Sequence, residues 1–227
     1  MNVPKISKRL EAAASLVRQG VRIADVGTDH AYLPIYLYTK GAISGGVASD
    51  INQGPVERAR MNVSAWGATG AIEVLRTDGL SGIEDKAPDD IFILGMGGEL
   101  IARILSDAPW VRSGKRLILQ PMTHPEILRE YLYKNGFSII DEIIVEEEKI
   151  YQIICAEYAG ASESADDVEL LFGKINIRRG GETFKRLLEH ARRVYLGRVS
   201  GKASAGADAA EELAIIERID QLLQGGL

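Results

Sequence analysis

The sequence predicts an α/β fold, in which a doubly wound sheet is followed by a smaller helical region. The first observation is that short apolar runs alternate with helical segments between residues 21 and 134, as in repeated βα units. The second is a pair of β-rich runs at 137–145 and 151–158. The third is a change in composition near Gly160, beyond which apolar residues recur at helical spacing.

Each element has its own supporting pattern. A helix is expected over 5–19, because one face of it would carry Ile6, Leu10, Ala13 and Val17. Apolar runs predict the strands of the repeated units at 21–26, 46–49, 72–76, 91–94 and 116–119. The intervening helices are expected at 35–40, from Gly54 and Pro55 onward, at 99–105 and at 125–134.

The two β-rich runs at 137–145 and 151–158 should complete the sheet. The segment 146–149 between them is too short for a parallel crossover, so the two runs should pair antiparallel. The sequence therefore predicts a sheet of seven strands whose last strand is antiparallel. Beyond a small, acidic linker at 160–168, two helical patterns follow, and 201–206 should form the turn of an αα-hairpin.

Composition narrows the class of protein. The chain has 227 residues and a net charge of −5, so any nucleic acid would have to bind at a local basic patch. A single cysteine, Cys155, excludes an internal disulfide and suits a reducing compartment. No apolar run is long enough for a membrane span, and no Cys/His cluster has metal-ligand spacing. We therefore expect a soluble, cytoplasmic protein without a metal.

Acidic residues mark the end of the first predicted strand, in the run Asp25-Val26-Gly27-Thr28-Asp29-His30. Ligands of open α/β sheets bind at the carboxyl ends of the strands. The run lacks the G-x-G-x-x-G phosphate-binding pattern, and its carboxylates suit a positively charged ligand such as S-adenosylmethionine (SAM). The alternative is that Asp25 and Asp29 only cap the next helix.

Two further aspartates end the second and third strands. Asp50, which precedes Ile51, could accept hydrogen bonds from both hydroxyls of a ribose, and Asp78, which precedes Gly79, could bind an adenine amino group. A single aspartate at such a position is often only a turn residue. Aspartates at three successive strand ends favour a nucleoside site, although they do not distinguish SAM from NAD.

The fourth strand ends in the glycine-rich run Gly95-Met96-Gly97-Gly98-Glu99. Such a run indicates either a tight turn or a close approach of the backbone to a ligand. Methyltransferases that act on exocyclic amines usually have an Asp/Asn-Pro-Pro-aromatic motif here, and this chain does not. A ring nitrogen would need no such motif, because its lone pair already lies in the plane of the ring.

In sequence order, these motifs resemble the bacterial tRNA (adenine-N1)-methyltransferase family that modifies adenine 22. The resemblance covers about residues 5–158 and is most specific in the run 23–34. It also includes Asp50, Gly54-Pro55, Asp78-Gly79-Leu80, Gly95-Met96-Gly97-Gly98 and Leu119-Gln120-Pro121. After Leu171-Phe172-Gly173 the family pattern has proline, whereas this chain has Lys174.

The resemblance implies a Rossmann-like, class I SAM-dependent methyltransferase that acts on N1 of an adenine in tRNA. Residues 1–160 would then form the SAM-binding catalytic domain, and 161–227 a helical, coiled-coil-like domain that contacts tRNA. The cofactor-binding residues would be Asp25, Gly27, Thr28, Asp29, His30, Asp50, Ile51, Asp78, Gly79, Gly95, Met96 and Gly97. The sequence does not determine the oligomeric state, and a monomer is favoured.

Three side chains are candidates for a part in the reaction. Methylation makes the adenine cationic, and Asp29 or Glu99 could stabilise that charge. Tyr32 could stack on the base, which must be unpaired or extruded because N1 lies on its Watson–Crick edge. Two alternatives remain open, namely a methyltransferase for small molecules and a nucleotide-binding module without catalysis.

The helical region contains a local concentration of positive charge. Residues 174–202 hold nine Lys and Arg residues against two Glu residues, a net charge of +7 in an otherwise acidic chain. Basic pairs at 178/179, 185/186 and 192/193 recur every seven residues, although Gly180-Gly181 could break the helix after the first pair. The expected RNA-binding residues are Lys185, Arg186, Arg192 and Arg193, and the alternative is a solvated helix face.

Overall fold

The computed structural model describes residues 3–225 and contains one seven-stranded sheet in the order β3-β2-β1-β4-β5-β7-β6. All neighbouring strands from β3 to β5 pair in parallel, and β7 pairs antiparallel with both β5 and β6. The strands are β1 (Val21–Val26), β2 (Ile43–Asp50), β3 (Ile72–Arg76), β4 (Asp90–Gly97), β5 (Arg116–Thr123), β6 (Phe137–Glu146) and β7 (Ile150–Tyr158). The predicted α/β fold with one antiparallel strand is therefore confirmed.

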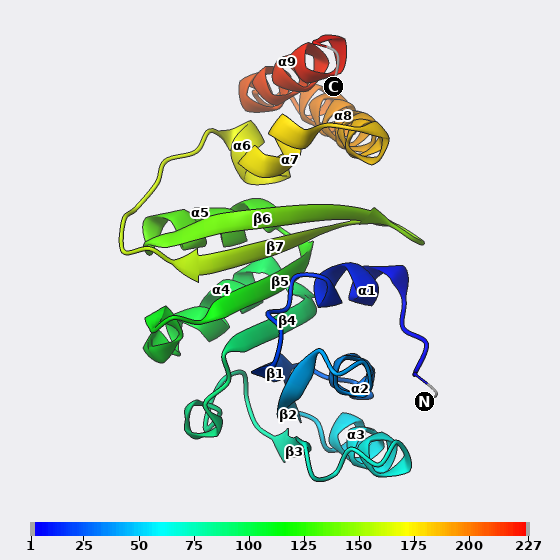
Figure 1. Ribbon diagram of the computed structural model, residues 1–227. Coiled ribbons are helices and arrows are strands. Elements are labelled where there is room, and N and C mark those ends of the chain that lie inside the picture. The colour runs from blue at the N-terminus through cyan, green and yellow to red at the C-terminus, as the bar shows by residue number, and fades with distance from the viewer. Residues whose placement is uncertain (1–2, 226–227) are drawn as a thin grey trace.

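Helices cover both faces of the sheet, as Figure 1 shows. On one face lie α1 (Lys8–Ala14), α2 (Tyr32–Thr39) and α3 (Gln53–Ala65), which bury Ala13, Leu37 and Val63 among others. On the other face α4 (Gly98–Ser106) and α5 (Pro125–Lys134) bury Ile101 and Leu128 against the central strands. The β3–β4 connection contains only the short 3-10 turn η1 (Glu84–Lys86), and η2 (Pro109–Arg112) precedes β5.

The rest of the chain is helical and packs beyond β6 at the end of the sheet (Figure 1). It consists of α6 (Asp167–Phe172), α7 (Lys174–Arg179), α8 (Glu182–Ser204) and α9 (Ala210–Gln224), the last two forming the expected hairpin. Its apolar core includes Phe172, Phe184 and Ile219, and Ile144 of β6 and Ile150 of β7 pack against it. Whether 1–160 and 161–227 are independent folding units stays a prediction.

Several predicted boundaries differ from the structure. The predicted turn at 201–206 is wrong in position, because α8 continues through Gly201 to Ser204 and the connection to α9 follows it. An ion pair of 2.6 Å between Lys202 and Glu212 holds this last turn of α8 against α9. The chain does leave the helix at Gly180 and Gly181, which have φ values of +60° and +97°. The basic pair at 178/179 therefore lies on α7, apart from α8.

The predicted N-terminal helix is also shorter than 5–19. It begins after Ser7, whose hydroxyl caps the amide of Leu10, and it ends at Ala14. Strand β2 is longer than predicted, since it starts at Ile43 and includes Gly45 and Gly46. In the described part of the chain, no helix is both long and apolar enough to cross a membrane.

Candidate cofactor and substrate site

Two neighbouring pockets lie at the carboxyl ends of the parallel strands, and Gly27 at the end of β1 lines both. The first has a volume of about 180 Å³, and its lining includes Asp50, Ile51, Asp78, Gly79 and Met96. The second has a volume of about 250 Å³, and its lining includes Arg9, Asp25, Thr28, Asp29, His30 and Tyr32. The fold thus brings most of the predicted cofactor residues together around a single glycine.

Gly27 is required at this position by its backbone and its surroundings. Its φ is +78°, and a Cβ atom there would overlap the end of the Met96 side chain from β4. The amides of Gly27 and Thr28 both donate to the carbonyl oxygen of Ser49 at 2.8 Å, which fixes the β1–α2 turn against β2. A side chain at residue 27 would therefore have to displace Met96 where the two pockets meet.

Asp25 is the buried acid of the site, with a relative exposure of 7%. Burial raises its pKa from 3.8 to about 6, because the charged carboxylate is poorly solvated. A hydrogen bond from Thr28 and the positive charge of Arg9 oppose this rise, whereas the charge of Asp50 adds to it. A positively charged ligand group beside Asp25 would add to the partial compensation that Thr28 and Arg9 provide.

Arg9 belongs to this site and is not among the residues predicted from the sequence. It is the one Lys or Arg in the lining of the second pocket. Its Nη1 donates to Oε1 of Gln120 at 2.7 Å, and its guanidinium lies 5.5 Å from the ring centroid of Tyr151. Gln120 on β5 is fully buried, so the Arg9 side chain is held in place from the sheet. No local motif links residues 9 and 120, which explains why the sequence did not reveal this contact.

The carboxylates of Asp50 and Asp78 line the same pocket, as the sequence predicted. Oδ1 of Asp50 accepts a hydrogen bond of 2.7 Å from the amide of Asn52, so its second oxygen is available to a ligand. Gly79 has a φ of +54°, and a Cβ atom there would lie 3.2 Å from the Ile104 side chain on α4. This turn therefore lets the chain pass close to α4 beside the pocket.

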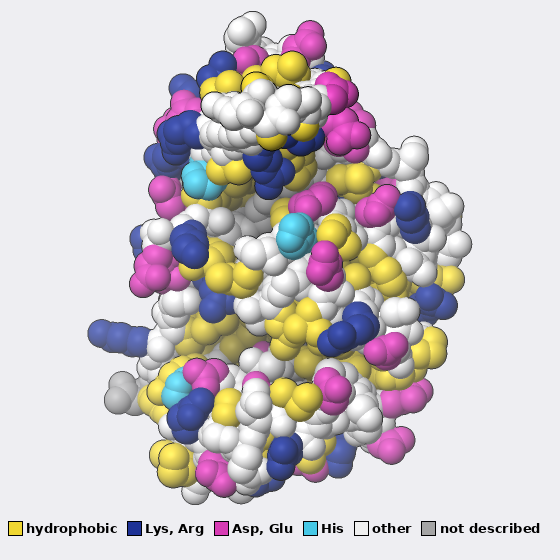
Figure 2. Space-filling view, turned by 180° about the vertical axis from the view of Figure 1, so that it is seen from behind, with side chains coloured by type: hydrophobic (Ala, Val, Ile, Leu, Met, Phe, Trp, Pro, Cys, Tyr) yellow, Lys and Arg dark blue, Asp and Glu magenta, His cyan; other side chains and the backbone are white. Residues whose placement is uncertain are grey.

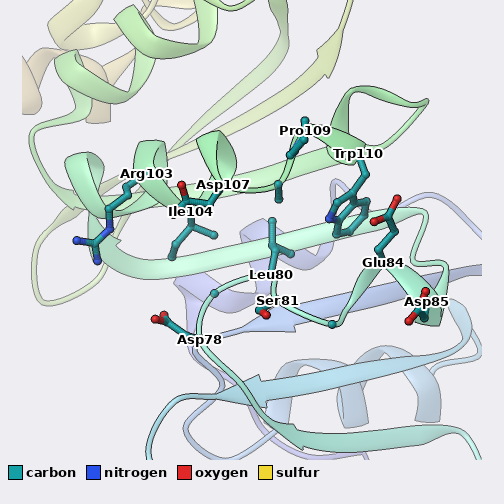
Figure 3. Close-up of a pocket in the computed structure, with 13 residues that line it drawn as sticks. Asp78, Leu80, Ser81, Glu84, Asp85, Arg103, Ile104, Asp107, Pro109 and Trp110 are labelled. Carbon is teal, nitrogen blue, oxygen red and sulfur yellow. The ribbon is translucent and has the colours of Figure 1, made fainter.

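A larger cleft of about 990 Å³ extends from Asp78 and Gly79 along α4, as Figure 3 shows. Leu80 and Ile104 lie in its middle, and Trp110 lies at the end away from Asp78. The cleft exists because the β3–β4 connection has no full helix to cover this side of α4. Its lining contains four carboxylates and a single Arg or Lys (Asp78, Glu84, Asp85, Asp107; Arg103). This acidic cleft is unfavourable for binding the phosphates of a nucleic acid.

At the rim of the second pocket, the carboxylate of Asp29 already has two partners. Its carboxylate pairs with Arg58 of α3 and lies 3.1 Å from Nε2 of His30. The His30 ring stacks on that of Tyr32, with centroids 5.2 Å apart and planes 18° apart. Tyr32 remains 40% exposed, so the aromatic pair offers a flat surface at the pocket mouth.

The glycine-rich run at the end of β4 and the start of α4 packs tightly against the end of β5. Gly95 has a φ of +79°, and a Cβ atom on Gly98 would overlap the backbone carbonyl of His124. Gly97 has an ordinary φ of −67° and is less restricted. Met96 reaches the first pocket, whereas Gly95 and Gly97 do not line either pocket. Glu99 is exposed in the first turn of α4 and also lines neither pocket.

The four basic residues predicted to bind RNA lie on α8 but face different surroundings. Arg192 pairs with Asp220 of α9 at 2.5 Å, and Arg186 pairs with Glu146 of β6 at 2.7 Å. Lys185 and Arg193 are exposed, and neither forms an ion pair with any residue in the described range 3–225. The same range contains no group of three or more His, Cys, Asp and Glu side chains that could hold a metal ion.

Comparison with protein-family models matches residues 6–154 to a methyltransferase domain. The tRNA (adenine(22)-N(1))-methyltransferase of Bacillus subtilis (strain 168) is 41% identical to this chain over 177 residues. The alignment covers 77% of this chain and 74% of the Bacillus protein.

Solved structures with similar folds agree with this comparison. A putative tRNA (m1A22) methyltransferase of Streptococcus pneumoniae, in complex with S-adenosyl-L-methionine, superposes with a TM-score of 0.87 at 34% identity. It covers 97% of this chain and 100% of its own. A TrmK protein of M. capricolum, in complex with S-adenosyl-homocysteine, has a TM-score of 0.77 at 27% identity and covers 96% of both chains.

Proposed function

Because the chain belongs to the tRNA (adenine(22)-N1)-methyltransferase family, we propose that it transfers the methyl group of SAM to N1 of adenine 22 in tRNA. The observation that carries this proposal is the pair of pockets that meet at Gly27. Together they place Asp25, Asp50 and Asp78 at the ends of β1, β2 and β3, in the fold for which related proteins are found with SAM and S-adenosyl-homocysteine.

The pockets fit the two ends of SAM. In the first, the free oxygen of Asp50 and the side chain of Asp78 would accept hydrogen bonds from the ribose hydroxyls and the adenine amino group. In the second, Asp25 would pair with the ammonium group of the methionine end. Gly27, which lines both pockets, and the movable end of the Met96 side chain would lie where the two ends are joined.

Arg9 would complete the methionine end by binding the carboxylate of SAM. It is the one Lys or Arg of that pocket, and its contact with Gln120 already orients the guanidinium. Arg9→Gln should therefore weaken SAM binding by about 10- to 100-fold, as expected for the loss of a charge-assisted hydrogen bond. Titration calorimetry with SAM measures this change, and an unchanged affinity would remove Arg9 from the site.

The protein's main contribution to the reaction is to position the base. Bound SAM supplies a methyl group on a sulfonium, which is already a good leaving group. The stacked pair of His30 and Tyr32 would hold the extruded adenine at the pocket mouth, so that N1 points toward the junction at Gly27. Such orientation can contribute up to about 7–11 kcal/mol to a reaction of this kind.

Asp29 and Glu99 differ in how they could act on the cationic product. Asp29 lines the pocket, but Arg58 and His30 already balance its charge, so it would chiefly position the His30 ring. Glu99 lies in the first turn of α4, outside both pockets. It could stabilise the cationic base only if the bound RNA brings the base close to that helix. Neither is needed to activate N1, since its lone pair is available in neutral adenine.

The direct test is incubation of the protein with labelled SAM and unmodified tRNA, followed by nucleoside analysis. The proposal expects labelled 1-methyladenosine in this tRNA. A tRNA in which adenine 22 is replaced by guanine should not become labelled. Transfer to small molecules but not to tRNA would favour the small-molecule alternative. Binding of SAM without any transfer would favour a non-catalytic module.

Two further properties belong to this proposal. The protein would act in the cytoplasm, where tRNA is present and where its single buried cysteine stays reduced. It would act as a monomer. Sedimentation analysis of the purified protein with and without tRNA measures the second property, and a stable dimer would contradict it.

A further inference from the structure

The cleft along α4, which we call the α4 cleft, is continuous with the pocket proposed for the nucleoside end of SAM. Asp78, Gly79, Arg103 and Ile104 line both. The α4 cleft has a volume of about 990 Å³, whereas the nucleoside pocket has a volume of about 180 Å³. The edge of an adenine that reaches Asp78 would therefore fill only a small part of the cleft, which leaves room for a further group.

The middle and the far end of the α4 cleft are apolar. Leu80 and Ile104 lie in the middle, and Trp110 lies at the end away from Asp78 (Figure 3). Leu80 and Ile104 belong to the apolar core, and Trp110 packs against this core, so the packing of the sheet holds all three side chains in place. An aromatic ring that enters the cleft thus meets apolar side chains first and an indole at the end.

The charges around these apolar walls favour a cation. The lining contains four carboxylates that form no ion pair with any residue in the described range 3–225, namely Asp78, Glu84, Asp85 and Asp107. Arg103 is the one Lys or Arg of the lining. Lys and Arg side chains gather instead on the helical region at the top of Figure 2, and no residue of that region lines the cleft. A cation in the cleft would thus be attracted by several carboxylates and could contact the indole of Trp110.

Resting on the proposed function, we infer that the α4 cleft is an accessory cofactor site, which accepts a cationic aromatic group joined to the amino nitrogen of the SAM adenine. In the proposed binding mode this nitrogen donates to Asp78, and it keeps one N–H donor when it carries a single substituent. Because Asp78 lines both the nucleoside pocket and the cleft, the substituent has a path past Leu80 and Ile104 toward Trp110. The sulfonium lies at the other end of the cofactor and is not affected.

The test uses S-adenosyl-homocysteine (SAH) and three analogues that carry a benzyl group on the adenine amino nitrogen. The ring bears no further group, a para-aminomethyl group or a para-carboxyl group, so the analogues have similar shapes but differ in charge. Titration calorimetry should show that the neutral analogue binds the wild-type protein within about threefold of SAH or more tightly, since its ring is buried on apolar walls. The cationic analogue should bind about five- to tenfold more tightly than the neutral one, and the anionic analogue should bind more weakly than both.

Two double variants that remove the same charge assign this preference to the cleft. Glu84→Gln/Asp107→Asn removes two carboxylates of the lining, whereas Glu57→Gln/Glu130→Gln removes two exposed carboxylates that do not line it. The preference for the cationic over the neutral analogue should fall at least about twofold in the first variant and stay at the wild-type value in the second. Both variants should bind SAH with the wild-type affinity, which is the readout that the fold and the nucleoside pocket are intact.

Three results would overturn the inference. These are a neutral analogue that binds more than about threefold more weakly than SAH, equal affinities for the cationic and the anionic analogue, or the same preference in both double variants. Failure of the proposed function is distinguishable, because the wild-type protein would then form no 1-methyladenosine with unsubstituted SAM.

Discussion

At the scale of single residues, Asp25 couples the affinity for SAM to pH. Burial raises its pKa to about 6, so the carboxyl is ionised at about pH 7.5 and mostly protonated at about pH 5. Only the ionised form can pair with the ammonium of SAM. Affinity should therefore fall about tenfold per pH unit below the pKa and be constant above it. Titration calorimetry across this range measures the profile, and a flat profile in wild type would contradict the assignment.

Asp25→Asn should separate the two effects of this buried charge. The pKa is higher in the folded state than the ordinary 3.8, so the carboxylate lowers stability progressively as pH rises from about 4 to about 6. The cost at neutral pH is on the order of 3 kcal/mol. The uncharged variant should thus have a higher Tm than wild type at about pH 7.5 without SAM, but bind SAM more weakly. A lower Tm would show that the carboxylate is already stabilised in the free protein.

The glycines after β4 differ in what they tolerate. Gly98→Ala should lower the free energy of unfolding by about 1–3 kcal/mol, because its Cβ would overlap the carbonyl of His124, which is backbone and cannot turn away. Gly97→Ala is the matched control, since its φ is −67° and its Cβ would lie 3.2 Å from the movable Oγ1 of Thr123. Denaturant titration compares the two variants. Similar stabilities would mean that the β4–α4 and β5–α5 turns can separate.

At the scale of elements, a buried ion pair holds the helical region to the sheet. Arg129 of α5 and Glu142 of β6 have no exposed side-chain surface and lie 2.7 Å apart. Arg129 also donates to Gln152 of β7 and to the carbonyl of Leu170 in α6, both at 2.8 Å. The second oxygen of Glu142 accepts from the amide of Ile175 in α7 at 3.0 Å. These contacts thereby bind α5, β6 and β7 to the short helices α6 and α7.

This ion pair predicts a large effect of a small substitution. Glu142→Gln leaves the buried guanidinium without a charged partner and should lower the free energy of unfolding by about 3–5 kcal/mol. The control is Glu130→Gln, which breaks the exposed pair with Lys134 on the same helix as Arg129 and should cost less than about 1 kcal/mol. Denaturant titration measures both. Equal small losses would show that Arg129 finds compensation elsewhere, which the structure does not show.

Gly173 explains why this junction could not be predicted from the sequence. Its φ is +88°, and a Cβ atom there would overlap the carboxylate of Glu142, which is distant in the sequence. The family pattern of proline after this glycine is replaced by Lys174, which donates to the carbonyl of Ser164 at 2.7 Å and lies over the Tyr133 ring. Local patterns gave no sign of α6 as a separate helix, since its capping residue Asp166 lies within the predicted acidic linker.

The elements that the sequence did predict share a physical reason. Strands β1 and β3 and helix α5 have the predicted bounds, because each combines a clear apolar pattern with a turn residue at its end. The carboxyl-end aspartates could be predicted because the topology of parallel strands places them at one edge. Arg9 could not, since its place depends on a contact with Gln120, 111 residues away.

At the scale of the whole molecule, the charges are arranged along one edge of the sheet. The cleft beside β3 and α4 is acidic, the two cofactor pockets lie in the middle, and the exposed cations Lys149 and Arg193 lie beyond β5. A net charge of −5 is therefore compatible with an RNA substrate, because the negative charge includes a side that RNA need not touch.

Removal of the whole helical region is a poor test of its part in RNA binding, because it also disrupts the sheet part. Removal of 161–227 would leave Arg129 and Glu142 without the backbone partners in α6 and α7, and would expose Ile144 and Ile150. We therefore expect residues 1–160 to be much less stable than the full chain and not to fold as an independent unit. Loss of activity in this fragment would say nothing about RNA binding.

A cut in the glycine break between α7 and α8 avoids the loss of these polar contacts. The fragment 1–180 retains α6, α7 and the contacts of the Arg129–Glu142 pair with them, but it loses α8 and α9 and their part of the apolar core. Because Arg9, Asp25, Asp50 and Asp78 are all retained, it should bind SAM with an affinity close to that of the full chain. Its KM for tRNA should rise at least about tenfold, since the exposed cations of α8 are absent. Thermal melts, SAM calorimetry and tRNA kinetics on 1–160, 1–180 and the full chain measure these effects. A stable 1–160 fragment with the tRNA kinetics of the full chain would contradict both the attachment of the helices and their part in the site.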